Sequence, residues 1–135
     1  MNDLPKPWII LVDDDEDDRF LVHQAFRAYS SSYLLQALEK PEELFQLLDD
    51  SVVLPALILL DLNMPLMNGF EVLKQLRSRM VYDAIPIVIL TTSDAESDRK
   101  LARDLGANSF LTKPPTLGQL LEIVIQLEQR WLVNR

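Results

Sequence analysis

Five side chains that could do chemistry follow short apolar runs of this sequence, each close to the point where its run ends. They are two adjacent carboxylates, a third carboxylate, a hydroxyl and an ammonium group: Asp13 and Asp14, Asp61, Thr91, and Lys113. Three carboxylates brought together would repel one another by about 4 kcal/mol per pair at 4 Å near a protein surface. Such a cluster either raises a pKa or recruits a cation. If the fold gathers these residues, we therefore expect a cation-binding site.

The type of cation and the reaction follow from the ligands. Oxygen ligands favour a hard cation, and the chain has no cysteine, so Mg²⁺ or Mn²⁺ fits better than zinc. Mg²⁺ binds phosphate oxygens alongside one or two carboxylates, and a carboxylate can act as a nucleophile that forms an aspartyl-phosphate. The Lys113 ammonium would pair with the incoming phosphoryl group, and the Thr91 hydroxyl would donate to one of its oxygens.

The five apolar runs have the length and composition of β-strands. The first, third and fourth are unbroken stretches rich in Ile, Leu and Val, as expected of strands covered on both faces. The second and fifth are more mixed, as expected of edge strands. The runs are Trp8–Val12, Tyr33–Ala37, Ala56–Leu60, Ile87–Leu90 and Ser109–Thr112.

The segments between and after these runs have the apolar period of helices. Pro41 can open a helix and Gly106 can close one. The first stripe, around Phe20, Leu21 and Ala25, is the least regular. The others are Leu44, Leu47 and Leu48; Val72, Leu73 and Leu76; Leu101, Ala102 and Leu105; and Leu117, Leu120, Leu121, Val124 and Ile125.

Strict alternation of strands and helices predicts a doubly wound α/β fold, in which right-handed crossovers build a parallel sheet with helices on both faces. Ligands of such sheets bind beyond the carboxyl ends of the strands, where the strand order reverses. Four of the five strands deliver a reactive or charged residue to that edge, so the site is expected there.

Length and composition set the limits on organisation and partners. The 135 residues suit one domain, which we expect over residues 7–135 after a short N-terminal extension of residues 1–6. The last helix runs to the end of the chain, so no output domain is expected. A net charge of −8 argues against nucleic acid as a partner. The apolar runs fall far short of the roughly 20 residues that a membrane helix needs, and no secretory signal is visible, so we expect a cytoplasmic protein without membrane contact.

A set of motifs, in order and spacing, resembles the receiver domain of two-component response regulators. The resemblance covers roughly residues 7–127, and the ordered set is highly specific although no single motif is. The motifs are Leu11-Val12-Asp13-Asp14-Asp15, Asp61-Leu62-Asn63-Met64-Pro65, Gly69, Leu90-Thr91 and Lys113-Pro114. The resemblance implies a flavodoxin-like, five-stranded sheet of order 2-1-3-4-5.

The resemblance also implies roles for individual residues. Asp61 would be the phosphoacceptor, and Lys113 would contact the phosphoryl group. Mg²⁺ (or Mn²⁺) would be bound by Asp14 directly, by Asp13 mainly through water, and by Asp61. The remaining implied roles are a metal contact through the backbone carbonyl of Asn63, a conformational switch formed by Thr91 and Phe110, tuning of phosphate hydrolysis by the side chains of Asn63 and Ser93, and a cis peptide before Pro114.

The expected partners follow from the same resemblance. A sensor histidine kinase or phosphotransfer protein would donate the phosphoryl group, and output would pass by protein–protein contact. The domain would catalyse its own phosphotransfer and autodephosphorylation without being an enzyme in the ordinary sense. A homodimer through the face of the fourth helix, fifth strand and fifth helix, about residues 97–131, is a further hypothesis, because Ile123 and Leu127 lie off the apolar stripe of the last helix.

Two other classes of protein compete with this interpretation. The first is a Mg²⁺-dependent hydrolase with an aspartate nucleophile, of the haloacid dehalogenase type. Its nucleophile would follow the first strand and a cap domain would be needed, whereas Asp61 follows the third strand. The second is a pseudo-receiver scaffold that works without phosphorylation, and the intact Asp14, Asp61, Thr91 and Lys113 count against it.

Overall fold

The computed structural model describes residues 7–29, 33–64 and 68–132. In this part of the chain, strands and helices alternate as the sequence predicts. The strands are β1 (Trp8–Val12), β2 (Leu34–Leu38), β3 (Leu57–Leu60), β4 (Ile87–Thr91) and β5 (Ser109–Thr112). The helices are α1 (Glu16–Tyr29), α2 (Pro41–Asp50), α3 (Gly69–Arg77), α4 (Glu96–Asp104) and α5 (Leu117–Leu127), with a short 3₁₀ helix η1 (Met80–Tyr82) and a π-helical turn η2 (Glu128–Leu132).

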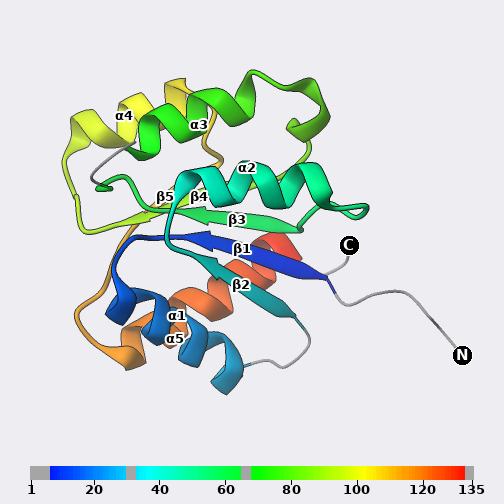
Figure 1. Ribbon diagram of the computed structural model, residues 1–135. Coiled ribbons are helices and arrows are strands. Elements are labelled where there is room, and N and C mark those ends of the chain that lie inside the picture. Colours follow the sequence, from blue (N-terminus) through cyan, green and yellow to red (C-terminus); the bar gives the residue numbers. More distant parts are fainter. Residues whose placement is uncertain (1–6, 30–32, 65–67, 133–135) are drawn as a thin grey trace, which may run out of the picture.

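The strands form one parallel sheet in the order β2-β1-β3-β4-β5, which confirms the predicted fold. Helices α1 and α5 cover one face, and α2, α3 and α4 cover the other (Figure 1). β2 and β5 are the edges, as their mixed composition indicates. The predicted second strand was one residue too early, because the ladder to β1 pairs Leu34 with Trp8 and Leu38 with Val12.

Each buried strand contributes side chains to two separate layers of the hydrophobic core, because successive side chains of a strand point to opposite faces of the sheet. Ile9 and Leu11 of β1 pack with α1 and α5, whereas Ile10 and Val12 pack with α2 and α3. All residues of β3 and β4 are buried. The three central strands are thereby held from both sides, and their carboxyl ends have little freedom to move.

The first helix buries a different stripe from the one predicted. Val22, Ala25 and Phe26 are buried, whereas Phe20 is 60% exposed. The spacing of the three buried residues places them on one side of the helix, and they contact the core shared with α5. The irregular apolar pattern of this segment had pointed to a stripe that partly faces solvent.

The last helix uses its extra apolar residues inside the domain. Leu127 is 3% exposed, and Ile123 packs against the core between α1, α5 and the sheet. The off-stripe position of these two residues therefore does not indicate an uncovered surface. Within the described residues, no helix has the length and apolar character needed to cross a membrane.

A close approach between α3 and the end of β3 depends on Gly69. Its N–H donates to the Leu62 carbonyl at 3.0 Å, and Asn68 caps the helix by accepting from Glu71 N–H. A Cβ on Gly69 would lie 2.3 Å from the Asp61 carbonyl oxygen and 2.7 Å from Leu62 Cα. Both are backbone atoms, so the helix start and the loop after β3 could not both keep their positions.

Gly69→Ala is therefore expected to lower the free energy of unfolding by about 1–3 kcal/mol, the usual range for overpacking. Gly118→Ala is the matched control, because a Cβ there meets nothing within 4 Å and α5 would gain a better helix former. Urea denaturation of the two variants tests the difference. Equal stability of both variants would show that the loop after Asp61 yields without strain.

Candidate functional site

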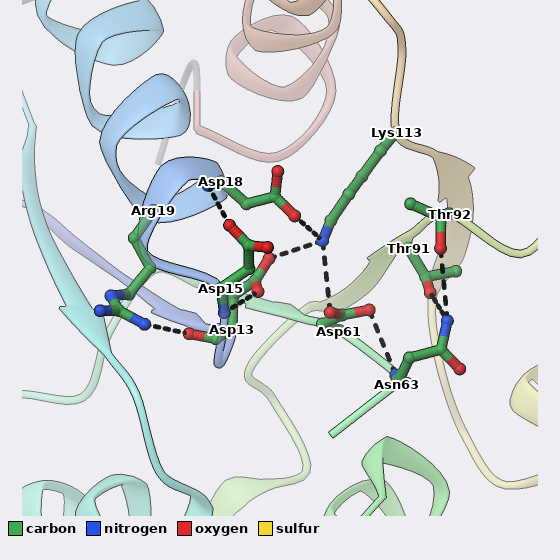
Figure 2. Close-up of polar contacts among 9 residues, drawn as sticks. All are labelled: Asp13, Asp15, Asp18, Arg19, Asp61, Asn63, Thr91, Thr92 and Lys113. Carbon is green, nitrogen blue, oxygen red and sulfur yellow. Dashed lines mark hydrogen bonds and ion pairs between the residues drawn. The ribbon is translucent and has the colours of Figure 1, made fainter. Parts of the chain in front are cut away.

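The carboxyl edge of the sheet gathers the side chains that the sequence singled out. Asp13 follows β1, Asp61 follows β3, Thr91 is the last residue of β4, and Lys113 follows β5. Figure 2 shows Lys113 pointing between Asp13 and Asp61, with Asn63 and Thr91 on the far side of Asp61. The prediction that these residues meet at one edge is confirmed.

Three carboxylates form a tight cluster at this edge. One oxygen from each of Asp13, Asp14 and Asp61 lies within 4.8 Å of the others. Asp13 is fully buried and Asp61 is 4% exposed. Burial raises the pKa of Asp13 from its ordinary value of 3.8 to about 6, and the charge of Asp61 adds to the rise, while Lys113 and the Asp15 N–H oppose it.

Lys113 is the only Lys or Arg in the described part of the chain that forms an ion pair with these carboxylates. Its Nζ lies 2.7 Å from Asp13 Oδ2, 2.6 Å from Asp18 Oδ2 and 3.2 Å from Asp61 Oδ2. Burial alone would lower the pKa of Lys113, but hydrogen bonds to Asp13 and Asp18 and the charges of Asp13 and Asp61 more than offset it and raise the pKa. Lys113 is therefore a permanent positive charge.

The negative charges of the cluster outnumber the positive charge beside them, so a further cation would be attracted. One ammonium pairs with the carboxylates of Asp13, Asp18 and Asp61, and the Asp14 carboxylate belongs to the same cluster. Asp13 Oδ2 is buried, and Lys113 Nζ contacts it at 2.7 Å. An electron-rich oxygen of this kind, beside two more carboxylates, is the donor set of a hard divalent ion. The residues present fit such an ion.

Asn63 connects the loop after β3 to the end of β4. Its N–H donates to Asp61 Oδ1 at 3.3 Å, and its Nδ2 donates to the hydroxyls of Thr91 at 3.3 Å and Thr92 at 3.4 Å. Thr91 is fully buried. A displacement of the Asp61 loop would therefore alter these hydrogen bonds at the end of β4.

The remaining predicted residues lie at different distances from the cluster. Phe110 lies in β5 beneath Arg99, whose guanidinium carbon is 4.9 Å from the ring centroid. Ser93 Oγ donates to Asp98 Oδ2 at 2.6 Å and accepts from Ala95 N–H, so in this structure it organises the start of α4. Pro65, named as part of a motif, lies outside the described residues.

The predicted cis peptide before Pro114 is not present: all peptide bonds of the described residues are trans, including that of Lys113 and Pro114. This prediction is therefore wrong for this structure. The trans form of a peptide before proline is favoured by about 0.5–1 kcal/mol unless contacts require the cis form. Lys113 reaches the cluster from the trans arrangement.

Sequence reasoning missed two residues of the site. Asp18 was not among the predicted site residues, yet its carboxylate makes the shortest contact to Lys113. Arg19 Nη1 donates to the Asp13 carbonyl at 2.9 Å and ties α1 to the end of β1 (Figure 2). Nothing in the acidic run distinguishes Asp18 from Asp17. The sequence did place this acidic run directly after the first strand, and acids at that position can reach the carboxyl edge of the sheet.

Comparisons with known proteins agree with this geometry. A sequence model described as "Response regulator receiver domain" matches residues 9–125. Response regulator Rcp1 of Synechocystis sp. is 33% identical over 133 residues, covering 95% of this chain and 90% of Rcp1. Probable methanogenesis regulatory protein FilR2 of Methanothrix harundinacea is 31% identical over 128 residues, covering 92% of this chain and 83% of FilR2.

Solved structures give the same result. The phosphorylated cyanobacterial phytochrome response regulator RcpA superimposes with a TM-score of 0.87 at 32% identity, over 97% of both chains. The Mn²⁺-bound form of response regulator Rcp1 gives a TM-score of 0.83 at 33% identity, also over 97% of both chains. This chain therefore belongs to the response regulator receiver domain family and is a phosphoacceptor signalling domain of the two-component type. The comparisons favour neither the hydrolase nor the pseudo-receiver.

The raised pKa of Asp13 predicts a pH-dependent stability of the metal-free protein. A carboxyl whose folded-state pKa lies above its unfolded value favours folding below pH 3.8 and loses that advantage as the pH rises through about 6. In EDTA at pH 8, Asp13→Asn should therefore raise the free energy of unfolding by up to about 3 kcal/mol, since one pKa unit corresponds to about 1.4 kcal/mol. The gain should disappear toward pH 4.

Denaturant titrations from pH 4 to pH 8 measure this gain. Asp17→Asn is the control, because Asp17 is exposed in the same acidic run and should change stability by no more than a few tenths of a kcal/mol at any pH. A constant difference between Asp13→Asn and the unmodified protein across this range would contradict the assigned burial of an ionised Asp13.

Proposed function

We propose that Asp61 is the phosphoacceptor of this receiver domain, with a phosphohistidine of a sensor histidine kinase or phosphotransfer protein as donor. The observation that carries the proposal is the position of the Asp61 carboxylate. It ends a fully buried strand, lies 3.2 Å from Lys113 Nζ, and belongs to the three-carboxylate cluster. No other described aspartate combines these three properties.

The proposed reaction is an in-line transfer. A carboxylate oxygen of Asp61 forms the new bond to phosphorus while the bond from phosphorus to the donor's histidine nitrogen breaks and that nitrogen keeps the electron pair. Lys113 is close enough to exchange its contact with Asp61 for one with a phosphoryl oxygen. The Thr91 hydroxyl accepts from Asn63, so its own proton remains available for a second phosphoryl oxygen.

Mg²⁺ or Mn²⁺ is the proposed cofactor, and when bound it neutralises charge on the phosphoryl oxygens and on the carboxylates around them. Its ligands would be Asp13, Asp14, Asp61 and the backbone carbonyl of Asn63. The three clustered carboxylates, of which two share the single ammonium group of Lys113, support a cation at this point. The Mn²⁺-bound form of Rcp1 supports a divalent ion in a similar protein.

Thr91 and Phe110 are the proposed switch, and Asn63 and Ser93 are proposed to tune hydrolysis of the phosphate. Thr91 is tied to the Asp61 loop through Asn63, which gives phosphorylation a direct route to β4. Phe110 is held by Arg99, which stacks on the ring and also donates to the Phe110 carbonyl at 3.3 Å. Phe110 is thereby connected to α4.

The domain is proposed to signal by protein–protein contact and not to turn over a separate substrate, and its cytoplasmic localisation stays a prediction. The face of α4, β5 and α5 is the proposed output surface and a possible homodimer contact. A groove of about 280 Å³ between α4 and β5 carries Glu96, Arg99 and Arg103. Charges of both signs on one patch suit a two-fold contact, in which each acid meets a base of the other copy.

Acetyl phosphate with Mg²⁺ should add one phosphoryl group to the protein, and Asp61→Asn should abolish the addition, because an amide oxygen is too poor a nucleophile. Intact-mass spectrometry measures the adduct. Asp17→Asn is the matched control and should be labelled as well as the unmodified protein, since Asp17 lies in the exposed acidic run and has no contact with the cluster. Chelation of Mg²⁺ with EDTA should stop labelling of both competent proteins, and full labelling of Asp61→Asn would refute the assignment of the acceptor.

The dimer hypothesis predicts a concentration-dependent increase in sedimentation coefficient that is larger after phosphorylation. Glu96→Arg should weaken the association at least about tenfold, because it places like charges opposite each other. Glu39→Arg, at an exposed position between β2 and α2 and therefore outside this face, is the control. A monomer at high micromolar concentration in both states would leave contact with a different protein as the output.

A further inference from the structure

The outer edge of β2 carries backbone groups that no described residue pairs with. Leu34 N–H donates to the Pro7 carbonyl and Asp13 N–H donates to the Leu38 carbonyl, so residues 34, 36 and 38 direct their backbone groups toward β1. In a parallel ladder the intervening residues point the other way. The N–H and C=O of Leu35 and Ala37 therefore face outward, and β1 is the only neighbour of β2 in the sheet.

This edge lacks the features that usually block a free strand. The strand sequence Leu-Leu-Gln-Ala-Leu contains no charge and no proline, and Leu34 is 56% exposed. The opposite edge is different. Lys113 N–H donates to the Thr91 carbonyl, so the alternation turns the Phe110 carbonyl outward, and there it accepts from Arg99 Nη1 at 3.3 Å. At least one outward backbone acceptor of the β5 edge is therefore occupied by a side chain of the domain.

A groove lies on each side of the open edge. Figure 1 shows β2 as an outermost strand, with α2 on one side and α1 on the other. The groove between β2 and α2, about 430 Å³, is lined by Glu42, Glu43 and Asp50 and by no basic side chain. The groove between β2 and α1, about 380 Å³, is different in charge and in character. Its lining includes Arg19, Phe20, His23, Arg27, Ala37 and one acid, Glu16.

An added strand would send its side chains alternately into these two grooves, since successive side chains of a strand point to opposite faces. Lysine or arginine would complement the acidic α2 groove. Tyrosine, aspartate or glutamate would suit the α1 groove, where Phe20 is exposed between Arg19 and Arg27. The edge thus favours an extended peptide with basic residues at every second position.

A second copy of this chain fits the edge poorly. Two copies can pair their β2 strands antiparallel only if a two-fold axis runs perpendicular to the sheet. This axis leaves the α2 side of both copies on the same side of the joined sheet. The α2 groove of one copy would then meet the α2 groove of the other. Glu42, Glu43 and Asp50 of both copies would come together without a base between them, which is electrostatically unfavourable.

We propose that the outer edge of β2 is a docking site for an extended peptide segment of another protein, which adds a sixth strand to the sheet and places basic side chains against α2. Backbone hydrogen bonds to Leu35 and Ala37 hold the segment, and the two grooves select its sequence. The site lies on the edge opposite β5, so it is separate from the α4–β5–α5 face and does not depend on phosphorylation of Asp61.

The test uses a fluorescein-labelled heptapeptide with lysine at the odd positions and tyrosine or aspartate at the even positions. Fluorescence anisotropy should show saturable binding, and amide hydrogen exchange of Leu35 and Ala37 should slow at least about tenfold in the complex. A peptide of the same composition with its lysines grouped at one end should bind at least about tenfold more weakly. A peptide N-methylated at the amides that would face β2 should not bind, because those donors are removed.

Charge reversal on the protein tests whether the peptide binds in the α2 groove or is only attracted by the net negative charge of the chain. Glu42→Lys with Asp50→Lys should weaken binding at least about tenfold, whereas Asp104→Lys with Glu122→Lys, the same charge change on α4 and α5, should alter it less than about twofold. Glu43 is kept because it accepts from the Lys40 N–H at the start of α2.

Equal weakening by both pairs of substitutions, unchanged exchange at Leu35 and Ala37, or absence of binding would overturn the proposal. So would self-association of the free protein through β2, detected as protection of the same two amides without peptide.

Discussion

The structure depends on three carboxylates that are kept close together against their mutual repulsion. Asp13 is fully buried, Asp61 nearly so, and their neighbour Asp14 lies within 4.8 Å. Lys113 offsets part of the repulsion from the centre of the cluster. The remaining excess of negative charge is maintained by the fold, and it favours the binding of a divalent ion. A cluster without this repulsion would gain less from a cation.

The carboxylates can be kept close together because the backbone that carries them is tightly packed. β1, β3 and β4 are buried on both faces, and their ends cannot separate without opening two layers of core. Gly69 brings the start of α3 against the Asp61 carbonyl, and Asn63 links the Asp61 loop to Thr91. The switch proposed for Thr91 and Phe110 would depend on this rigidity.

The two edges of the sheet differ in which backbone groups are available to a partner. On the β5 edge, Arg99 satisfies the outward carbonyl of Phe110, so this backbone acceptor is already occupied by a side chain of the domain. On the β2 edge, the backbone of Leu35 and Ala37 is available beside two grooves of different charge. The proposed output surface and the proposed peptide site therefore lie at opposite edges of the sheet.

The order of strands and helices, the edge at which the site forms and most of its residues followed from the sequence, because unbroken apolar runs and the polar residues that end them are local signals. The alternation of the runs was enough to bring Asp13, Asp61, Thr91 and Lys113 together. Local patterns did not suffice for α1, where the buried stripe of Val22, Ala25 and Phe26 is selected by contact with α5.

Only the tertiary structure decided that Asp18, and not Asp17, reaches Lys113, 95 residues away in the chain. It also decided that Leu127 is buried, that the Lys113–Pro114 peptide is trans, and that the β2 edge is open. The physical reason is common to all of these. Each depends on which atoms of distant segments meet, and neither the period nor the composition of a single segment contains that information.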